Sequence, residues 1–561
     1  MLFVFDKNIF AERALIILSC LSLFFYLFPK IPFLTNAYMS ILIMLYVIYL
    51  YMSKTKIKIS TIFPISLVLL FYILFQGVYN QDFEHKNTKY FILATLLLIT
   101  QVYNTIFRKN YEFTIKTILI SVVAFNFTFA LKLLLSKNNA IYLIELHFDN
   151  IGIYAIFISI SSIIFMHLSK KINTLYINHI ARTIIVIAIL GIFILGSRTA
   201  LIVIASYLIF DYLIKINHSK IRYITGFALI LILSTVLTFS IKKDSSYGRF
   251  FVWKTTYIMF EDNLLSGIGY GNFASKYPIY QASMYENKKM SSREISLADN
   301  TKVAFNEFLH ITSELGIIGI IIFVLLMIAL LKKSKEHRFL YFSIFVAMFF
   351  SYILHSSVIT HMLILTLSLS ILPVINLKPA ISRMIILCIF IFAGVSLVFW
   401  VNKYRSYMVA NIIWKQSQPL INTYYEKNRI YLCDNLNLLY AMAEYNYNIK
   451  EFDKALVLLK QSDKLIIRNE TELLKGKCYF KKGIHDLAEK HLRLSVAICP
   501  NRFINRYELF KFYLDSDMKN KAIKEALMIH HLEEKIQSIH TIVIKNYIAD
   551  FLKENSIISE K

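Results

Sequence analysis

Apolar segments separated by short polar connections follow one another from residue 11 to residue 401, and this pattern predicts a bundle of membrane-spanning helices. Crossing a hydrocarbon core of about 30 Å requires roughly 20 helical residues. Thirteen segments of 16 to 22 residues reach or approach this length, so the expected fold class is all-α and polytopic. Their approximate ranges are 11–29, 36–52, 61–79, 90–107, 114–135, 150–168, 181–196, 199–214, 223–241, 314–331, 339–356, 360–376 and 383–401.

The segments at 181–196 and 199–214 form one nearly continuous apolar run. A single helix over residues 183–214 would extend about 48 Å at 1.5 Å per residue, which exceeds the thickness of a bilayer unless the helix tilts strongly. We therefore expect the helix to break at Gly196-Ser197-Arg198-Thr199. This break places Arg198 at the extracytoplasmic surface of the membrane that the chain spans, or slightly below that surface.

Composition agrees with a membrane protein, because 57% of the residues are hydrophobic and only 17% are charged. The net charge of +25 could also indicate nucleic-acid binding, but short cytoplasmic loops of membrane proteins collect Lys and Arg. The basic residues gather in alternate connections, so we expect no nucleic-acid partner. The groups assigned to the cytoplasm are Lys54, Lys56, Lys58, Arg108, Lys109, Lys116, Lys170, Lys171, Arg182, Lys215, Lys220, Arg222, Lys332, Lys333, Lys335, Arg338, Lys378 and Arg383.

The charge asymmetry also predicts the orientation of the chain. The opposite short connections hold few basic residues, chiefly Lys86, Lys89, Lys137 and Arg198. By the positive-inside rule the N-terminus is cytoplasmic, and an odd number of spans places the C-terminal tail outside. The expected location is a bacterial inner membrane, with a transmembrane domain over residues 1–401 and a periplasmic tail.

After residue 401 the sequence becomes charged and amphipathic, which predicts a separate helical domain over residues 402–561. Ala455, Ala488 and Ala522 recur at intervals of 33 and 34 residues, close to the period of tetratricopeptide repeats. We expect three repeats of paired helices forming an α-solenoid, with an unrelated helical bundle as the alternative. Around Ala488 the residues at the offsets of such a repeat are Gly476, Tyr479, Gly483, Leu492 and Pro500.

Two arginines are candidate ligands for phosphate. Arg198 lies at the predicted outer surface or slightly below it, and a guanidinium at membrane depth is costly unless it is paired. Arg249 lies in a hydrophilic outer loop over residues 242–304, which is longer than a tight connection requires. The planar guanidinium can donate two parallel hydrogen bonds to a phosphate. The alternative for Arg198 is that its side chain extends to lipid headgroups.

The same loop contains aromatic residues and a glycine-rich motif. Trp253 and Tyr270 offer flat faces on which sugar rings pack, so they are candidate substrate-binding residues. Gly267, Gly269 and Gly271 resemble a dinucleotide-binding loop only in spacing, because no βαβ unit surrounds them. The five cysteines are scattered without Cys/His metal spacing, so we expect neither a zinc site nor a redox pair.

The loop ends in a polar motif that enters a predicted span. Asn306, His310 and Glu314 recur every four residues and therefore share one face of a helix. A polar stripe entering a membrane helix is expected to face a wet cavity rather than lipid. We take His310, Glu307 and Glu314 as candidate catalytic residues and Asn306 as a substrate-binding residue. The alternative is a motif that only starts the helix.

Four short motifs follow one another in fixed order around the outer loop. They are Ser197-Arg198-Thr199-Ala200-Leu201, the segment from Arg249 to Trp253, Gly267-Ile268-Gly269-Tyr270-Gly271-Asn272-Phe273, and Asn306-Glu307-Phe308-Leu309 followed by Glu314-Leu315-Gly316. In order, spacing and position these motifs resemble those of the superfamily of O-antigen ligases and O-antigen polymerases, which also includes bacterial protein O-oligosaccharyltransferases. The resemblance covers about residues 180–330.

The resemblance implies a GT-C-like membrane glycosyltransferase that needs no metal and no cofactor. Its donor would be a glycan linked to undecaprenyl diphosphate, and Arg198 and Arg249 would bind the diphosphate. The ligases usually have His immediately before the Asn of the last motif, where this chain has Phe305. The role of that histidine does not transfer directly, and His310, further along the helix, is the candidate substitute.

Several acceptors are compatible with this donor. The expected chemistry is attack of an acceptor hydroxyl on the anomeric carbon of the first sugar, with lipid diphosphate leaving. A ligase would use lipid A core or Ser/Thr of a protein, and a polymerase would use another O-unit. An external repeat domain suits a protein partner and favours ligation. The rival from another class is a non-catalytic transporter or scaffold, but the sequence shows no obvious paired repeats in the membrane part.

The predicted topology can be tested at the end of the chain. Alkaline phosphatase depends on disulfides that form in an oxidising compartment, so a fusion after Lys561 should be active. Activity of a cytoplasmic reporter at the same position would instead contradict the arrangement of thirteen spans.

Overall fold

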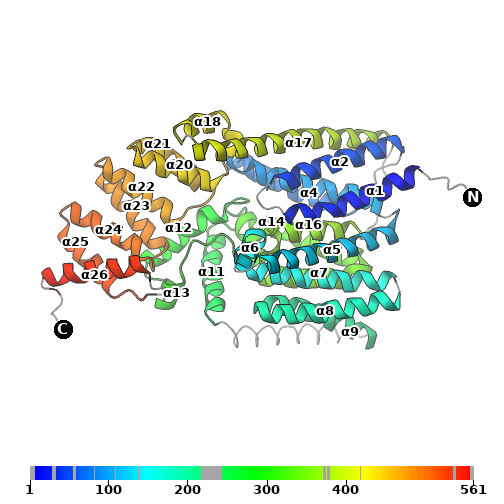
Figure 1. The fold of residues 1–561 in the computed structure, drawn as a ribbon, viewed down its shortest axis with the longest axis horizontal. Coiled ribbons are helices and arrows are strands. Elements are labelled where there is room, and N and C mark those ends of the chain that lie inside the picture. The colour runs from blue at the N-terminus through cyan, green and yellow to red at the C-terminus, as the bar shows by residue number, and fades with distance from the viewer. Residues whose placement is uncertain are drawn as a thin grey trace, which may run out of the picture.

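The computed structural model is almost entirely helical (Figure 1). Two short strands, β1 (Ile59–Ser60) and β2 (Val374–Ile375), form one antiparallel pair. The predicted span at 223–241 lies outside the described residues. The described residues are 7–27, 33–54, 59–80, 83–107, 109–136, 139–172, 174–216, 243–369, 374–375, 379–416, 418–534, 538–555 and 557.

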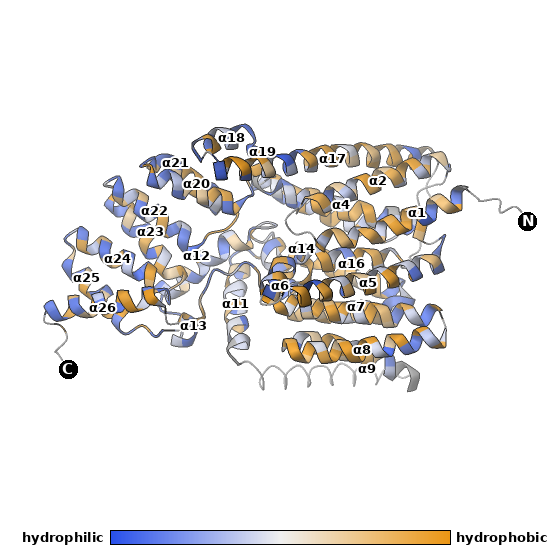
Figure 2. Cartoon of the chain, in the orientation of Figure 1, coloured by the Kyte–Doolittle hydropathy of each residue, from blue (hydrophilic) through white to orange (hydrophobic). Residues whose placement is uncertain are grey.

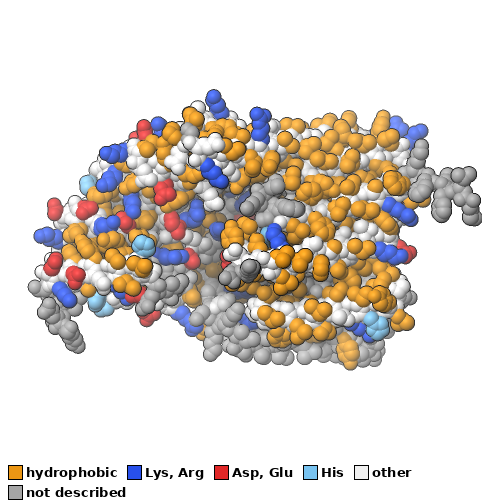
Figure 3. Space-filling view, viewed as in Figure 1, with side chains coloured by type: hydrophobic (Ala, Val, Ile, Leu, Met, Phe, Trp, Pro, Cys, Tyr) orange, Lys and Arg blue, Asp and Glu red, His pale blue; other side chains and the backbone are white. Residues whose placement is uncertain are grey.

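The apolar helices lie side by side in one bundle, whose residues are mostly hydrophobic (Figure 2). Hydrophobic side chains dominate the face of the bundle that Figure 3 presents. A short 3-10 turn, η1 (Ser22–Leu27), follows the first helix. The helices of the bundle are α1 (Lys7–Leu21), α2 (Leu34–Met52), α3 (Phe63–Tyr79), α4 (Phe83–Phe107), α5 (Tyr111–Leu135), α6 (Ala140–Phe148), α7 (Ile151–Ile172), α8 (Leu175–Leu195), α9 (Arg198–Ile216), α14 (Glu307–Lys333), α15 (Arg338–Phe350), α16 (Ser357–Ser368) and α17 (Pro379–Gln416).

The chain is a multi-pass membrane protein. Eight of the described helices are long and apolar enough to cross a membrane, namely α1 with η1, α2, α4, α5, α7, α8, α14 and α17. Helices α3, α15 and α16 are apolar but shorter, and α9 is helical over the predicted span at 199–214. The total of thirteen spans stays a prediction.

The structure confirms the expected break in the long apolar run. Helix α8 ends at Leu195, and Gly196 follows with a φ of 63° in the left-handed region. Glycine adopts this conformation readily because it has no Cβ atom. Helix α9 then begins at Arg198, so the break places this arginine at a helix end.

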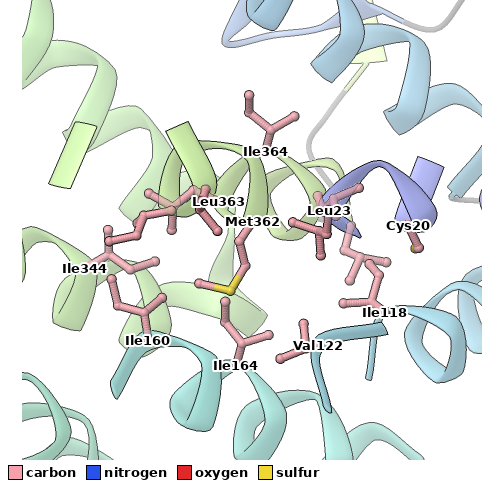
Figure 4. Close-up of a cluster of buried hydrophobic side chains, with 14 of the residues drawn as sticks. Cys20, Leu23, Ile118, Val122, Ile160, Ile164, Ile344, Met362, Leu363 and Ile364 are labelled. Atoms are coloured by element: carbon pink, nitrogen blue, oxygen red, sulfur yellow. The ribbon is translucent and has the colours of Figure 1, made fainter. Parts of the chain in front are cut away.

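A closely packed core in the middle of the bundle holds α16 in place. Figure 4 shows Met362 of α16 directed toward Ile164 of α7, with Val122 of α5 nearby. Between membrane helices, such packing supplies much of the attraction because lipid is as apolar as the side chains. The core thereby also positions the short turn η4 (Ile353–His355), which immediately precedes α16.

The hydrophilic loop predicted at 242–304 folds into three helices, α11 (Lys243–Glu261), α12 (Phe273–Glu286) and α13 (Ser292–Leu297). Ser291 caps α13, since its Oγ accepts a hydrogen bond from the Glu294 N–H at 3.3 Å. In Figure 1 these helices lie between the bundle and the C-terminal tail. The loop is therefore an ordered layer that both parts can contact.

Helix α17 connects the bundle to the tail. It contains 38 residues and is about 57 Å long at 1.5 Å per residue. The side chain of Lys403 is fully buried, and its Nζ lies 2.7 Å from Asp434 Oδ1 and 3.0 Å from the Tyr431 carbonyl oxygen. The expected boundary at residues 401 and 402 falls within this continuous helix, and the two domain ranges stay a prediction.

The tail consists of short helices stacked in pairs. The first helices of the pairs α20/α21, α22/α23 and α24/α25 begin 33 and 34 residues apart, and Ala455, Ala488 and Ala522 are fully buried in the second helices. Assignment to the tetratricopeptide family stays a prediction. The helices of the tail are α18 (Ile421–Lys427), α19 (Arg429–Leu432), α20 (Leu436–Asn448), α21 (Phe452–Asp463), α22 (Asn469–Lys481), α23 (His485–Ile498), α24 (Phe503–Asp515), α25 (Lys519–His530) and α26 (Ile539–Glu554).

Hydrogen bonds fasten the tail to the outer loop. Gln281 of α12 donates its side-chain N–H to the Ile498 carbonyl oxygen at 2.6 Å. Asn501 donates to the carbonyl oxygens of Ser296 and Ala298 at 2.8 and 2.9 Å. Because buried amides lose free energy when they are unpaired, these contacts fix the loop against the tail.

Lys475 in α22 is the central cation of a buried cluster in the tail. Its Nζ pairs with Asp463 and lies 2.5 Å from Glu472 Oε1, and the Lys475 side chain is 4% exposed. Replacing Lys475 with Met removes the cation that Asp463 and Glu472 share, although His491 Nδ1 still lies 2.6 Å from Glu472 Oε2. The free energy of unfolding of the tail should therefore fall by about 3 kcal/mol. Hydrogen exchange of α21 and α22 in the full chain in detergent measures this loss.

Lys454→Met is the matched control, because the Lys454–Glu451 pair is 3.5 Å long with both side chains largely exposed. Its loss should cost less than about 1 kcal/mol. Equal protection of α21 and α22 in the two variants would show that the buried cluster contributes no special stability.

Candidate functional site

Arg198 and Arg249 lie together because the start of α9 packs against α11. The Arg198 guanidinium donates to Ser246 Oγ of α11 at 2.9 Å. The Arg249 guanidinium approaches Thr199 Oγ1 of α9 at 3.5 Å. Each arginine therefore contacts the helix that carries the other one, and the break at Gly196 makes this arrangement possible.

Arg249 is the more deeply held of the two. Its guanidinium donates to the Phe350 carbonyl oxygen at the end of α15 at 2.8 Å, and its Cζ lies 5.9 Å from the ring centre of Phe305. Burial lowers the pKa of Arg249, and the positive charge of Arg198 lowers this pKa further. Two cations held this close repel each other, so an anion bound between them would be stabilised.

The paired arginines line a cavity of about 450 Å³. A cavity of this size can enclose a small polar group such as a diphosphate with an attached sugar. Its wall comes from the α6–α7 connection, the α8–α9 break, α11 and the segment that follows α13. The lining residues are Asn150, Ile151, Gly152, Leu195, Gly196, Ser197, Arg198, Thr199, Ser245, Gly248, Arg249, Val252, Leu297, Asp299, Thr301 and Phe305.

The polar stripe of the loop-end motif is directed into the protein and not toward a wet cavity, which corrects the expectation from its spacing. Counted over the whole residue, Asn306, His310 and Glu314 are 2%, 5% and 4% exposed. Asn306 caps α14, since its side-chain oxygen accepts a hydrogen bond from the Leu309 N–H at 3.1 Å. Asn306 therefore holds the start of α14 in place, as the alternative of a helix-start motif predicts, and its role in binding substrate stays a prediction.

Glu314 binds the glycine-rich motif through its carboxylate. Its Oε2 accepts from the Gly271 N–H at 2.8 Å, and its Oε1 accepts from the Phe273 N–H at 3.0 Å. Charge-assisted hydrogen bonds of this kind are stronger than neutral ones. The carboxylate thereby fixes the connection between α11 and α12, including the start of α12.

The backbone of the glycine-rich motif also pairs directly with α14, which is broken at Gly316 with a φ of 65°. The Ile268 N–H donates to the Ser313 carbonyl oxygen at 3.0 Å, and the Ile317 N–H donates to the Leu264 carbonyl oxygen at 2.9 Å. A Cβ atom on Gly316 would lie 2.2 Å from the Leu265 carbonyl oxygen. Glycine is therefore required where the two backbones meet.

The remaining candidate bases lie close to a residue that the sequence reasoning missed. His310 Nε2 lies 3.4 Å from Glu314 Oε1. Glu307 Oε1 accepts from the Leu354 N–H at 2.6 Å and lies 3.6 Å from His355 Nδ1. His355 belongs to no motif, and its only sequence signal is a polar residue at the end of an apolar run.

Among the described residues, the two aromatic candidates for sugar binding, Trp253 and Tyr270, lie outside the lining of the arginine cavity. Trp253 Nε1 donates to the Ala304 carbonyl oxygen at 2.9 Å. The Tyr270 ring packs beside Tyr90 of α4, with 6.1 Å between the ring centres. Their roles in binding sugar stay a prediction.

These features define a helical membrane protein with a paired-arginine cavity beside an ordered loop at one end of its bundle. Residues 183–324, about a quarter of the chain, match the family model described as O-antigen ligase. The match supports the ligase and polymerase superfamily of membrane glycosyltransferases, whose substrates are a lipid-linked glycan donor and an acceptor. No curated protein and no solved structure matches the chain.

The described ranges contain no group of three or more His, Cys, Asp or Glu side chains arranged to hold a metal ion. The matched segment includes the paired arginines, the glycine-rich motif and Glu314. His355 lies beyond its end.

Gly316→Ala tests the backbone contact between the loop and α14. The added Cβ atom would meet backbone, and the positive φ is unfavourable for alanine. The variant should destabilise the contact between the glycine-rich motif and α14 by about 2 kcal/mol. In the purified full chain, protease should therefore cleave the Leu264–Gly271 connection more readily. Gly394→Ala in α17 is the control, because its Cβ would meet no atom within 4 Å. Equal protection of the connection in both variants would contradict the prediction.

Proposed function

We propose that this protein transfers a glycan from undecaprenyl diphosphate to an acceptor hydroxyl at the periplasmic face of the inner membrane, as an O-antigen ligase does. The observation that carries the proposal is the pair of arginines, Arg198 and Arg249, which line one cavity inside the segment that matches the ligase family. A diphosphate is the group of this donor that two adjacent guanidinium groups would bind.

In the proposed reaction the acceptor oxygen forms a bond to the anomeric carbon of the first sugar. The bond from this carbon to the diphosphate oxygen breaks, and its electron pair leaves with the lipid diphosphate. The acceptor proton passes to a base. Stabilising the negative charge on the departing diphosphate is the largest task, and Arg198 and Arg249 would perform it without a metal or a cofactor.

For the acceptor we favour ligation to lipid A core or to Ser/Thr of a protein. The tail supports this choice, because a cavity of about 650 Å³ lies between it and the loop, with Tyr285 and Met290 on the loop side and Arg493 and Met528 on the tail side. A tetratricopeptide-like tail would bind a protein acceptor or another protein partner there. The second candidate is an O-antigen polymerase. The remaining alternative is a non-catalytic transporter or scaffold, in which the arginine pair would have no catalytic role.

Substitution of the two arginines tests the proposal. Arg198→Ala or Arg249→Ala removes a charge-assisted contact to the leaving group, so the transfer rate should fall by about 100-fold or more. Lysine at either position keeps the charge but loses the two-pronged hydrogen bonding, so it should still lower the rate. The measurement is transfer in vitro from purified undecaprenyl-diphosphate glycan, with the protein inserted in liposomes and divalent metal chelated throughout.

Arg293→Ala is the control, because Arg293 belongs to the same loop but packs over the Tyr247 ring, 3.6 Å from its centre, and is not among the residues that line the arginine cavity. It should retain most of the transfer activity. Transfer at the wild-type rate by both cavity variants would show that the arginines do not bind the donor. A strict requirement for added metal would contradict the metal-free mechanism.

A further inference from the structure

His355 lies in the turn η4 and faces the loop-end motif. Its Nδ1 lies 3.6 Å from Glu307 Oε1, and its ring centre lies 4.5 Å from that of His310 at nearly a right angle. The neighbouring Leu354 N–H donates to the same Glu307 oxygen at 2.6 Å. Glu307 is therefore fixed against the turn that carries His355, which is the arrangement of a carboxylate that orients a histidine.

Exposure separates His355 from the other candidate bases. The side chains of Glu307, His310 and Glu314 are 1%, 6% and 5% exposed, whereas that of His355 is 36% exposed. Both oxygens of Glu314 already accept backbone N–H groups. Within the described residues, His355 faces Glu307 through Nδ1. In the neutral imidazole a proton on Nδ1 leaves the lone pair of Nε2 to accept a proton from a bound molecule.

An aromatic pair connects His355 to the arginine cavity. The ring centres of His355 and Tyr352 are 6.2 Å apart, and those of Tyr352 and Phe305 are 5.4 Å apart. Phe305 lines the cavity and lies beneath the Arg249 guanidinium. Asn150, another lining residue, donates to the Tyr352 hydroxyl. A sugar extending from a diphosphate on the arginines could therefore reach the side on which His355 lies.

We propose that His355 is the general base of the transfer reaction and that Glu307 positions it. This inference rests on the proposed function. As the acceptor oxygen bonds to the anomeric carbon, its proton moves to Nε2 of His355, and the electron pair of the breaking carbon–oxygen bond leaves with the diphosphate. Nδ1 keeps its proton toward Glu307, whose carboxylate stabilises the imidazolium. The imidazolium then releases the acceptor proton to water.

Partial burial of the His355 imidazole and the charges around it together determine how the reaction should depend on pH. Glu307 and Glu314 act on its imidazole from α14, Lys89 acts from α4, and Asp149 lies on the α6–α7 connection. Glu307 is the nearest of these. Because its negative charge stabilises the imidazolium, removing it should allow His355 to become neutral, and therefore active, at a lower pH.

The test compares His355→Gln, Glu307→Gln and His310→Gln in the liposome transfer assay across pH. His355→Gln should lower kcat by about 100-fold with little change in KM and should abolish the acidic limb of the pH profile. Glu307→Gln can still accept the Leu354 N–H, so it should fold. Its acidic limb should move to lower pH by about one unit. His310→Gln should keep the wild-type position of that limb.

Wild-type kcat and an unchanged acidic limb in His355→Gln would overturn the role of His355 while leaving the proposed function intact. Loss of the limb in His310→Gln instead would assign the base to His310. If His355→Gln does not fold, an unshifted limb in Glu307→Gln overturns the proposal by itself. Absence of transfer by the wild-type protein would overturn the proposed function first.

Discussion

The contact between the glycine-rich motif and the broken helix α14 is the constraint on which the outer part of the molecule depends. Backbone N–H groups on each side donate to carbonyl groups on the other, and Glu314 adds two charge-assisted hydrogen bonds. Because α14 belongs to the membrane bundle, the contact anchors the loop to a rigid element. The ends of α11 and α12 are fixed by it, and these helices carry Arg249 and the docking surface for the tail.

The same constraint explains how two like charges remain together. Arg198 is held by the helix break at Gly196, and Arg249 is held by α11, whose far end is anchored at α14. Burial of Arg249 and repulsion between the two guanidinium groups both oppose this arrangement. Packing and hydrogen bonds elsewhere maintain it. The two guanidinium groups are thereby held in fixed positions on the walls of one cavity, and an anion placed between them would meet oriented donors.

Local patterns were sufficient for the apolar helices and for the helix pairs of the tail. They revealed neither the three helices of the outer loop nor the contacts between distant segments. Hydropathy predicted the bundle, the length of the run over residues 183–214 predicted the break at Gly196, and the alanine spacing predicted the helix pairs of the tail. The pairing of the glycine-rich motif with Gly316 joins segments far apart in sequence, so no period in either reveals it. The sequence also cannot show that the Glu314 carboxylate accepts two backbone N–H groups, and a catalytic role for this residue stays a prediction. His355 was missed because it is a lone histidine in an apolar run.

Helix α13 contributes to the walls of both the arginine cavity and the cavity between the loop and the tail. Ile295 of this short helix lines the cavity between the loop and the tail, whereas Leu297 lines the arginine cavity. Asn501 of the tail donates to carbonyl groups at residues 296 and 298, on either side of Leu297. A displacement of the tail would therefore move α13 and reshape both cavities together. Helix α13 is therefore a wall that the two cavities share, and its position depends on the contact between the loop and the tail.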